Sequence, residues 1–259
     1  MRPSGAGAWG TFLSGLIAEL LFIAHGVGAN GKTTEIDEIL AKILGEYACA
    51  ADAALLTTKK EPGGTTPELC ALRGVRAVFV NETGEKDWLN ESRVKYITAK
   101  DMMYGNPKYK DPVNWKPTHK PVLRTNHKPK IRGTDEGMWR RVQYIPYTLI
   151  TPKDERDITF SEKYLLPELS GILNWLIAGW MKYQADGMRL KEPKCVLQGT
   201  QGYKEESDIT GRWVSTRLVK APPGGILMLM DAHTDFVNWY QDEIGDSKYA
   251  VGHISRGLC

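Results

Sequence analysis

One segment, between Leu20 and Leu44, limits the possible folds more than any other part of the chain. Its apolar run Leu20–Ala24 predicts a buried strand, and apolar residues at helical spacing from Ile36 onward predict a helix. Between them stands the pattern G-x-x-x-x-G-K-T. In this pattern glycines let backbone N–H groups surround a phosphate, the lysine reaches the β and γ phosphates, and the threonine hydroxyl ligates Mg²⁺. The context predicts a nucleotide-binding α/β domain with a loop formed by Gly26, Gly28, Asn30, Gly31, Lys32, Thr33 and Thr34.

Composition sets wider limits. With 259 residues the chain can form one large domain, or one domain with a small appendage. Its net charge of +3 is too small to indicate a nucleic-acid partner by itself, so such a partner has to be argued from where the charges lie. The four cysteines form no C-x-x-C pair, which favours a reducing, cytoplasm-like compartment. Neither apolar stretch, residues 11–24 or Leu169–Met181, fits a signal peptide or a membrane span, because Glu19 interrupts the first and the second is shorter than about 20 residues.

Further strands and helices are expected after the first helix. Val75–Val80 is a β-branched apolar run that predicts a second strand, and Glu82 gives it an acid near its carboxyl end. Pro121–Asn126 is a third strand candidate with a polar Thr-Asn end. Helices are predicted for Trp88–Lys100 and for Leu165–Tyr183, the latter with a core-facing apolar side. The segment Met138–Ile145 places Arg140 and Arg141 directly before a fourth apolar stretch, which predicts a strand at Val142–Ile145.

The most basic part of the chain runs from Lys108 to Arg132. It contains eight Lys or Arg against the single acid Asp111, with Tyr109 and Trp115 among them. A surface for single-stranded nucleic acid needs cations for the phosphates and aromatic rings for the bases. From the pattern alone, a solvated basic hairpin explains the segment equally well.

The order of these motifs resembles the superfamily 3 helicases, and within them the phage and plasmid primase-helicases related to the poxvirus primase-helicase. The resemblance rests on the glycine loop together with two rarer segments, TNHKP at 125–129 and DEGMWRR at 135–141, and it follows most of the chain. It implies that Lys32 binds phosphate, that Thr33 holds Mg²⁺, and that Glu82 either polarises the attacking water or holds the metal with Thr33. It further implies that Asn126 senses the γ-phosphate. Arg141 best matches the arginine that contacts a neighbouring subunit's nucleotide, and Arg140 is the alternative for this role.

The same resemblance implies an α/β fold, an AAA+-type P-loop NTPase core with a central parallel sheet flanked by helices. A helical region and a partial winged-helix-like tail would follow. We expect a remnant of an upstream helical region at 1–19, the ATPase core at 20–150, the helical region at 151–192, and an incomplete DNA-binding tail at 193–259. The basic hairpin corresponds to a loop projected into a central pore, with DNA contacts from Lys108, Lys110, Lys116 and Lys120.

The implied function is that of an ATP- and Mg²⁺-dependent replicative DNA helicase motor. Subunits of a homo-oligomeric ring, a hexamer, would hydrolyse ATP between them and move on single-stranded DNA, with a primase domain or primase partner and no membrane. The compartment would be the cytoplasm, that of the host cell for a phage-encoded protein. The alternative is a replication protein that binds nucleotide and DNA without productive unwinding, because the family's usual residues are replaced at Asn81, Ala99, Lys100 and Asn106.

Overall fold

The computed structural model divides the chain into two compact units, residues 1–201 and 202–259. The residues that it describes are 6–57, 65–81, 84, 87–132, 135–220 and 225–244. Among the helices within these ranges, none combines the length and the apolar character that crossing a membrane requires.

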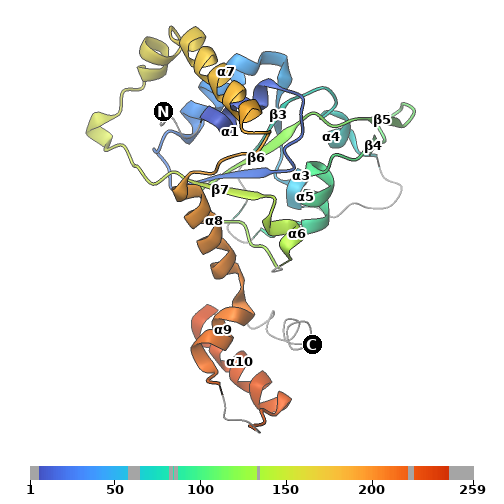
Figure 1. The fold of residues 1–259 in the computed structure, drawn as a ribbon, viewed down its shortest axis with the longest axis vertical. Coiled ribbons are helices and arrows are strands. Elements are labelled where there is room, and N and C mark those ends of the chain that lie inside the picture. Colours follow the sequence, from blue (N-terminus) through green and yellow to red (C-terminus); the bar gives the residue numbers. More distant parts are fainter. Residues whose placement is uncertain are drawn as a thin grey trace. The chain divides into compact units, whose positions relative to one another are not determined.

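The first unit is built on a five-stranded parallel sheet with the strand order β2-β3-β6-β1-β7 (Figure 1). The central strand β1 pairs with β6 through Phe22 and Val122, and with β7 through Phe22 and Gln143. Since all five strands are parallel, their carboxyl ends lie at one edge of the sheet. The strands are β1 (Leu21–His25), β2 (Ala48–Ala51), β3 (Ala77–Val80), β6 (Lys120–Thr125) and β7 (Val142–Pro146).

The predicted α/β class with a central parallel sheet flanked by helices is confirmed. The strands expected near Val75–Val80 and Pro121–Asn126 form as β3 and β6. The strand expected at Val142–Ile145 forms as β7, and the short helix α6 (Glu136–Trp139) precedes it. Strand β2, with the sequence ACAA, was not expected, since it lacks the β-branched and aromatic residues by which strands are recognised.

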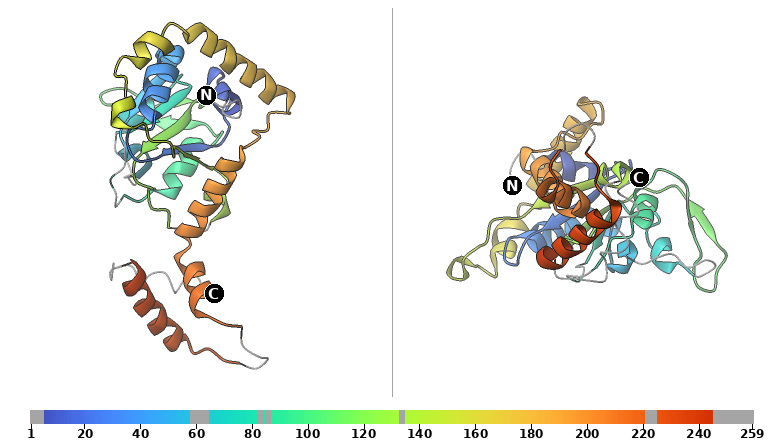
Figure 2. Two further views of the ribbon diagram at one scale, coloured as in Figure 1. Left: turned by 90° about the vertical axis from the view of Figure 1, so that its left-hand side faces the viewer. Right: turned by 90° about the horizontal axis from the view of Figure 1, so that it is seen from below.

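Helices cover both faces of the sheet. The π-helical turn η3 (Thr34–Leu40) and α2 (Ala41–Leu44) form the helix after the glycine loop, which ends at Gly45 with φ 55°. The short helix α1 (Ala6–Gly10) packs against α7 (Leu169–Ala185) on one side of the sheet, and α5 (Glu91–Thr98) lies on the other (Figures 1 and 2). The other short elements of this unit are η2 (Thr11–Leu13), η4 (Gly45–Tyr47), α3 (Ala54–Thr57), α4 (Pro67–Cys70), η5 (Lys153–Glu155) and η6 (Ser161–Leu165).

The core that supports the glycine loop lies under β1. Its aromatic centre is Trp9, Phe12 and Phe22, whose ring centroids are 5.4–6.0 Å apart. Gly10 lets α1 approach α7 closely, because a Cβ at this position would lie 2.6 Å from the carbonyl oxygen of Leu176. The α1–α7 pair therefore closes one side of the sheet next to the loop.

A two-stranded antiparallel hairpin, β4 (Met103–Gly105) and β5 (Val113–Trp115), stands away from the central sheet (Figures 1 and 2). It is inserted between α5 and β6. Gly105 is required here, since a Cβ would lie 2.6 Å from Cys70 Sγ and 2.9 Å from the Trp115 ring. Trp115 is buried and packs at the base of this hairpin.

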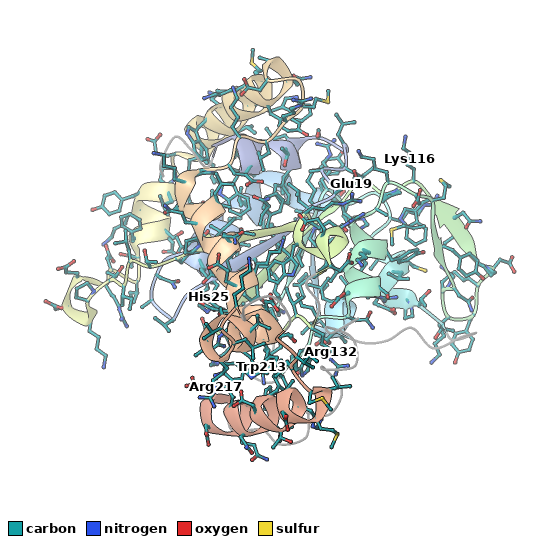
Figure 3. All side chains as sticks on the ribbon, turned by 60° about the horizontal axis from the view of Figure 1, so that its bottom comes forward. Glu19, His25, Lys116, Arg132, Trp213 and Arg217 are labelled. Atoms are coloured by element: carbon teal, nitrogen blue, oxygen red, sulfur yellow. The ribbon has the colours of Figure 1, made fainter. Side chains whose placement is uncertain are left out.

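The second unit is helical in the residues that the structure describes. Helix α8 (Lys194–Ser207) runs into it, and α9 (Ile209–Arg217) and α10 (Leu229–Ile244) form it. Trp213 is its buried centre and meets the Phe236 ring edge to face at 5.5 Å. Asp235 accepts a 2.8 Å hydrogen bond from the Trp213 indole and also pairs with Arg217. Figure 3 labels Trp213 and Arg217. The winged-helix-like nature of this tail stays a prediction.

Candidate functional site

The glycine loop directly follows β1, at the carboxyl edge of the sheet. Gly26 is required by packing, because a Cβ would lie 2.3 Å from the carbonyl oxygen of Tyr147. Gly31 has φ +83°, a left-handed conformation that favours glycine. The Asn30 amide donates to the carbonyl oxygens of Val27 and Tyr147, so one side chain holds the loop in shape and ties it to the segment after β7.

Lys32 lies inside the loop, with 7% of its surface exposed. Its ammonium donates hydrogen bonds to the carbonyl oxygen of Gly26, to Asn30 Oδ1 at 3.3 Å and to Asn126 Oδ1 at 3.0 Å. The last contact joins residues 94 positions apart, at the carboxyl ends of β1 and β6. The structure therefore brings together two of the residues that the sequence singled out.

Local structure fixes the direction of Asn126. The hydroxyl of Thr125, the last residue of β6, donates to the carbonyl oxygen of His127 at 2.6 Å and accepts from the His127 N–H at 3.1 Å. These bonds close a tight turn around Asn126 and aim its amide at Lys32. A polar side chain in this place can contact the γ-phosphate end of a nucleotide bound in the loop.

The Mg²⁺ expectation concerns Thr33 and Glu82. Thr33 is exposed at the beginning of the helix after the glycine loop, whereas Glu82 lies outside the described residues. The described residues contain no group of three or more His, Cys, Asp or Glu side chains that could hold a metal. A hydroxyl with one carboxylate still fits Mg²⁺, which keeps several waters and binds through one or two protein groups plus phosphates.

Arg124 has a role that the sequence did not indicate. It was grouped with the basic residues of a nucleic-acid surface, but its guanidinium pairs with Asp37 of η3 and donates to Asn81 at the end of β3. Arg124 therefore connects the helix after the loop to the strand that precedes Glu82. The only signal in the sequence was a charge placed inside the apolar strand run at 121–126.

Arg140 and Arg141 lie at the amino ends of the strands, at the edge of the sheet opposite the glycine loop. The carbonyl oxygen of Arg141 accepts the N–H of Leu21 at 2.7 Å, so this pair stands beside the start of β1. A five-residue strand spans about 13 Å, so the chain's own loop begins at the far end of that strand. Arg141 is 8% exposed and donates to the carbonyl oxygen of Gly137, while Arg140 is exposed. Of the two, Arg140 is the side chain that a neighbouring molecule can reach.

Three of the four predicted DNA-contacting lysines share the hairpin region. Lys108 and Lys110 lie in its loop, and Lys116 follows β5; all three are exposed, and Lys116 points away from the sheet in Figure 3. Tyr109, between the first two, is 91% exposed and has φ 61°. The Lys108 ammonium lies 5.0 Å from the centre of the Tyr109 ring. Cations around one open ring match the chemistry of single-strand contacts.

Lys120 does not belong with these exposed lysines, and its predicted contact with DNA is not what the structure shows. Its side chain is 1% exposed, its ammonium donates to the carbonyl oxygen of Ser14 at 2.8 Å, and it lies 5.6 Å from the Phe12 ring centre. Burial, followed by repulsion from Arg76, lowers the pKa of Lys120 to about 7. A lysine enclosed in this way holds the segment before β1 in place and is not presented to a DNA strand.

Comparison with known proteins gives matches over most of the chain. A family of unknown function (DUF5906) matches residues 24–141. A protein of Acanthamoeba polyphaga mimivirus named "Putative helicase L207/L206" is 32% identical over 253 residues, and one of frog virus 3 named "Putative helicase 022R" is 28% identical over 247 residues. These matches cover 89% and 88% of this chain, and 26% and 25% of the relatives.

A third relative and one solved structure extend these matches. A protein of African swine fever virus named "Putative primase" is 23% identical over 261 residues, covering 94% of this chain and 27% of its own. The apo structure of the NrS-1 C-terminal region has a TM-score of 0.55 at 17% identity, over 93% of this chain and 63% of that one, which shows a shared fold.

The chain spans about a quarter of the length of the curated relatives that it matches. Their names support a relationship between this chain and the helicases and primases of large DNA viruses.

Proposed function

We propose that this chain is the ATP-hydrolysing motor of a superfamily 3 type replicative helicase, with an AAA+-type core. The observation that carries the proposal is the contact between Lys32 Nζ and Asn126 Oδ1, at 3.0 Å, beside a glycine loop at the carboxyl edge of a parallel sheet. In α/β folds of this kind, ligands bind at that edge. The names of the viral relatives support a nucleic-acid substrate for the motor.

The residues divide the chemistry between them. The loop backbone and Lys32 would hold the β and γ phosphates, where the ammonium stabilises charge that grows in the transition state. Thr33 and Glu82 would hold Mg²⁺, which neutralises charge on the same phosphates. Asn126 would orient the γ-phosphate or the attacking water, because its amide already points at the Lys32 ammonium.

The edge opposite the loop would serve a neighbouring subunit. Arg140 is exposed beside the start of β1, about one strand length from the chain's own loop. An arginine in this place completes a nucleotide site only in an assembly such as a ring, where it reaches the next molecule's γ-phosphate. We therefore assign the role of the arginine acting in trans to Arg140, and a structural role to Arg141.

The hairpin would contact single-stranded DNA. Lys108, Lys110 and Lys116 are exposed around the open ring of Tyr109, and the hairpin stands away from the sheet. Phosphates would pair with the lysines and a base would stack on the tyrosine. A chain that contacts DNA at the hairpin and ATP at the loop has the two sites that a translocating motor needs.

The test measures ATP hydrolysis with and without single-stranded DNA, together with displacement of a labelled strand. Asn126→Ala should lower hydrolysis by on the order of 10², whereas Asn238→Ala, on the exposed side of α10, should leave it unchanged. DNA-stimulated hydrolysis without strand displacement would favour the alternative of a nucleotide- and DNA-binding replication protein that does not unwind.

A further inference from the structure

A cavity of about 450 Å³ opens beside the glycine loop, within the first unit. Its walls include Trp9 of α1, Trp175 of α7 and Tyr147 directly after β7, and Asn30 and Glu35 border it on the side of the loop. Pockets for small organic ligands are typically apolar and aromatic, with a few polar groups that fix the ligand's orientation. This cavity has that character.

A larger cavity of about 950 Å³ also borders the loop, but its chemistry differs. Besides Glu35 it is lined by four carboxylates, and its lining includes one basic side chain, Arg156. Three aromatic side chains, those of Phe160, Tyr164 and Trp175, also line this larger cavity, but negative charge in such excess disfavours a polyphosphate there. These four carboxylates belong to Glu38, Glu155, Asp157 and Glu168.

Glu35 and Lys191 are the charged residues that line the smaller cavity. The Lys191 ammonium pairs with Asp186 at 2.6 Å, whereas Glu35 lies next to the loop. Its N–H donates to the carbonyl oxygen of Gly31 at 2.9 Å, which places it one helical turn from the loop. Its Oε2 accepts the Tyr147 hydroxyl at 2.8 Å. Burial raises the pKa of Glu35, whereas hydrogen bonding from the Tyr147 hydroxyl and then from the Trp9 indole opposes that effect.

An ionised carboxylate accepts hydrogen bonds and donates none, and it has about four acceptor positions. The bond from the Tyr147 hydroxyl holds the carboxylate in one orientation while using part of this capacity. The remaining positions suit a ligand that brings an N–H donor into the cavity. A ligand that brings a carbonyl oxygen to the same place meets electrostatic repulsion.

We propose that this cavity receives the base of the nucleotide and that Glu35 selects adenine by accepting a hydrogen bond from its exocyclic amino group. The inference rests on the nucleotide site proposed above, since the phosphates must lie in the loop for the base to reach Glu35. Guanine presents a carbonyl oxygen where adenine carries its amino group, so the carboxylate disfavours GTP. Trp9, Trp175 and Tyr147 give a purine ring more aromatic surface than a pyrimidine can use.

The magnitude follows from the chemistry of the contact. A site built to bond a ligand N–H can reject an analogue that lacks it by large factors, because the buried partner is then left unpaired. For the half-buried Glu35 we expect a preference for ATP over GTP of about tenfold or more. The Glu35→Gln variant should narrow this preference to about threefold or less, because an amide can either accept or donate.

The experiment measures displacement of a fluorescent ATP analogue from the full chain at pH 7.5, without turnover. The competitors are ATP, GTP, CTP, UTP and purine riboside triphosphate, which is ATP without the amino group. Glu38→Gln is the matched control, because Glu38 lies on the same helix but lines only the larger cavity. Thermal unfolding of each variant shows whether it folds.

We expect wild-type protein to bind ATP about tenfold or more tightly than GTP and than purine riboside triphosphate, and CTP more tightly than UTP. Glu35→Gln should reduce these ratios, and Glu38→Gln should keep them. Equal wild-type affinities for ATP and purine riboside triphosphate would overturn the inference, even if no Glu35 variant folds. Unchanged ratios of ATP affinity to GTP affinity in folded Glu35→Gln protein would overturn it as well. If ATP and GTP bind equally well and Lys32→Met abolishes the binding of both, the nucleotide site stands and only the proposed base selection is overturned. If wild-type protein binds no nucleotide, the proposed function falls with it.

Discussion

Neutralising the three exposed lysines of the hairpin region should weaken DNA binding in a way that depends on salt. The change is Lys108→Gln, Lys110→Gln and Lys116→Gln in one protein, at positions that the structure leaves open to solvent. Each phosphate contact on a single strand contributes about 0.7 to the slope of log K against log salt. Three lost contacts flatten the slope by about 2 units, so wild-type affinity should fall roughly 20-fold more than that of the variant between 50 and 200 mM salt.

Fluorescence polarisation with a labelled oligonucleotide, titrated at several salt concentrations, measures this slope. Lys120→Met is the matched control, because it removes a lysine from the same sequence segment but from a buried site 1% exposed to solvent. It should leave the slope unchanged and alter thermal stability instead. A triple variant with the wild-type slope would refute the assignment of the hairpin as a DNA contact. A slope lowered by Lys120→Met would refute the assignment of Lys120 to the core.

Three further predictions concern single residues. Mixing Arg140→Ala with Lys32→Met subunits on DNA should restore part of the hydrolysis that each lacks alone, because a Lys32→Met subunit still offers its arginine to an intact loop; no recovery in oligomers confirmed by light scattering would return the role to Arg141. Since burial lowers the pKa of Lys120 from 10.5 to about 7, the folded state binds fewer protons than the unfolded chain between these values, and the melting temperature should rise with pH from about 7 to 10 relative to Lys120→Met; a parallel pH dependence in the two proteins would contradict this. Glu82→Gln should keep affinity for fluorescent nucleotide while hydrolysis drops, because the amide keeps the shape of the carboxylate and loses the charge that would polarise the attacking water; a joint loss would indicate that Glu82 acts only as a metal ligand or in the fold.

The sequence predicted the parts of the fold that depend on local pattern. The strand, glycine loop and helix at Leu20–Leu44 are recognised by an apolar run, by the spacing of the glycines and by apolar residues at helical spacing. Strand β2 was not predicted, because Ala48–Ala51 is a strand only through its pairing with β3 and alanine has no local preference for the strand conformation. Tertiary pairing, not propensity, decides such a segment.

The candidate site shows the same division. The Lys32–Asn126 contact could be anticipated only through the family resemblance, because nothing local connects residues 94 positions apart. The sequence could not separate Lys120 from Lys116, or Arg141 from Arg140, since burial is set by neighbours such as Phe12 and Gly137. In the sequence, Glu35 is an ordinary acidic residue in the first turn of a helix, and only the structure shows that it lines a cavity.

The most direct test of the nucleotide site is steady-state ATP hydrolysis by Lys32→Met beside wild-type protein, each with and without single-stranded DNA. Methionine is a better replacement than alanine, because Lys32 is 7% exposed and methionine keeps the volume of its buried aliphatic stem. Circular dichroism and thermal unfolding confirm that the variant folds. We predict DNA-stimulated hydrolysis by the wild type and none above background by Lys32→Met. Wild-type turnover in folded Lys32→Met protein would contradict a nucleotide site at this loop.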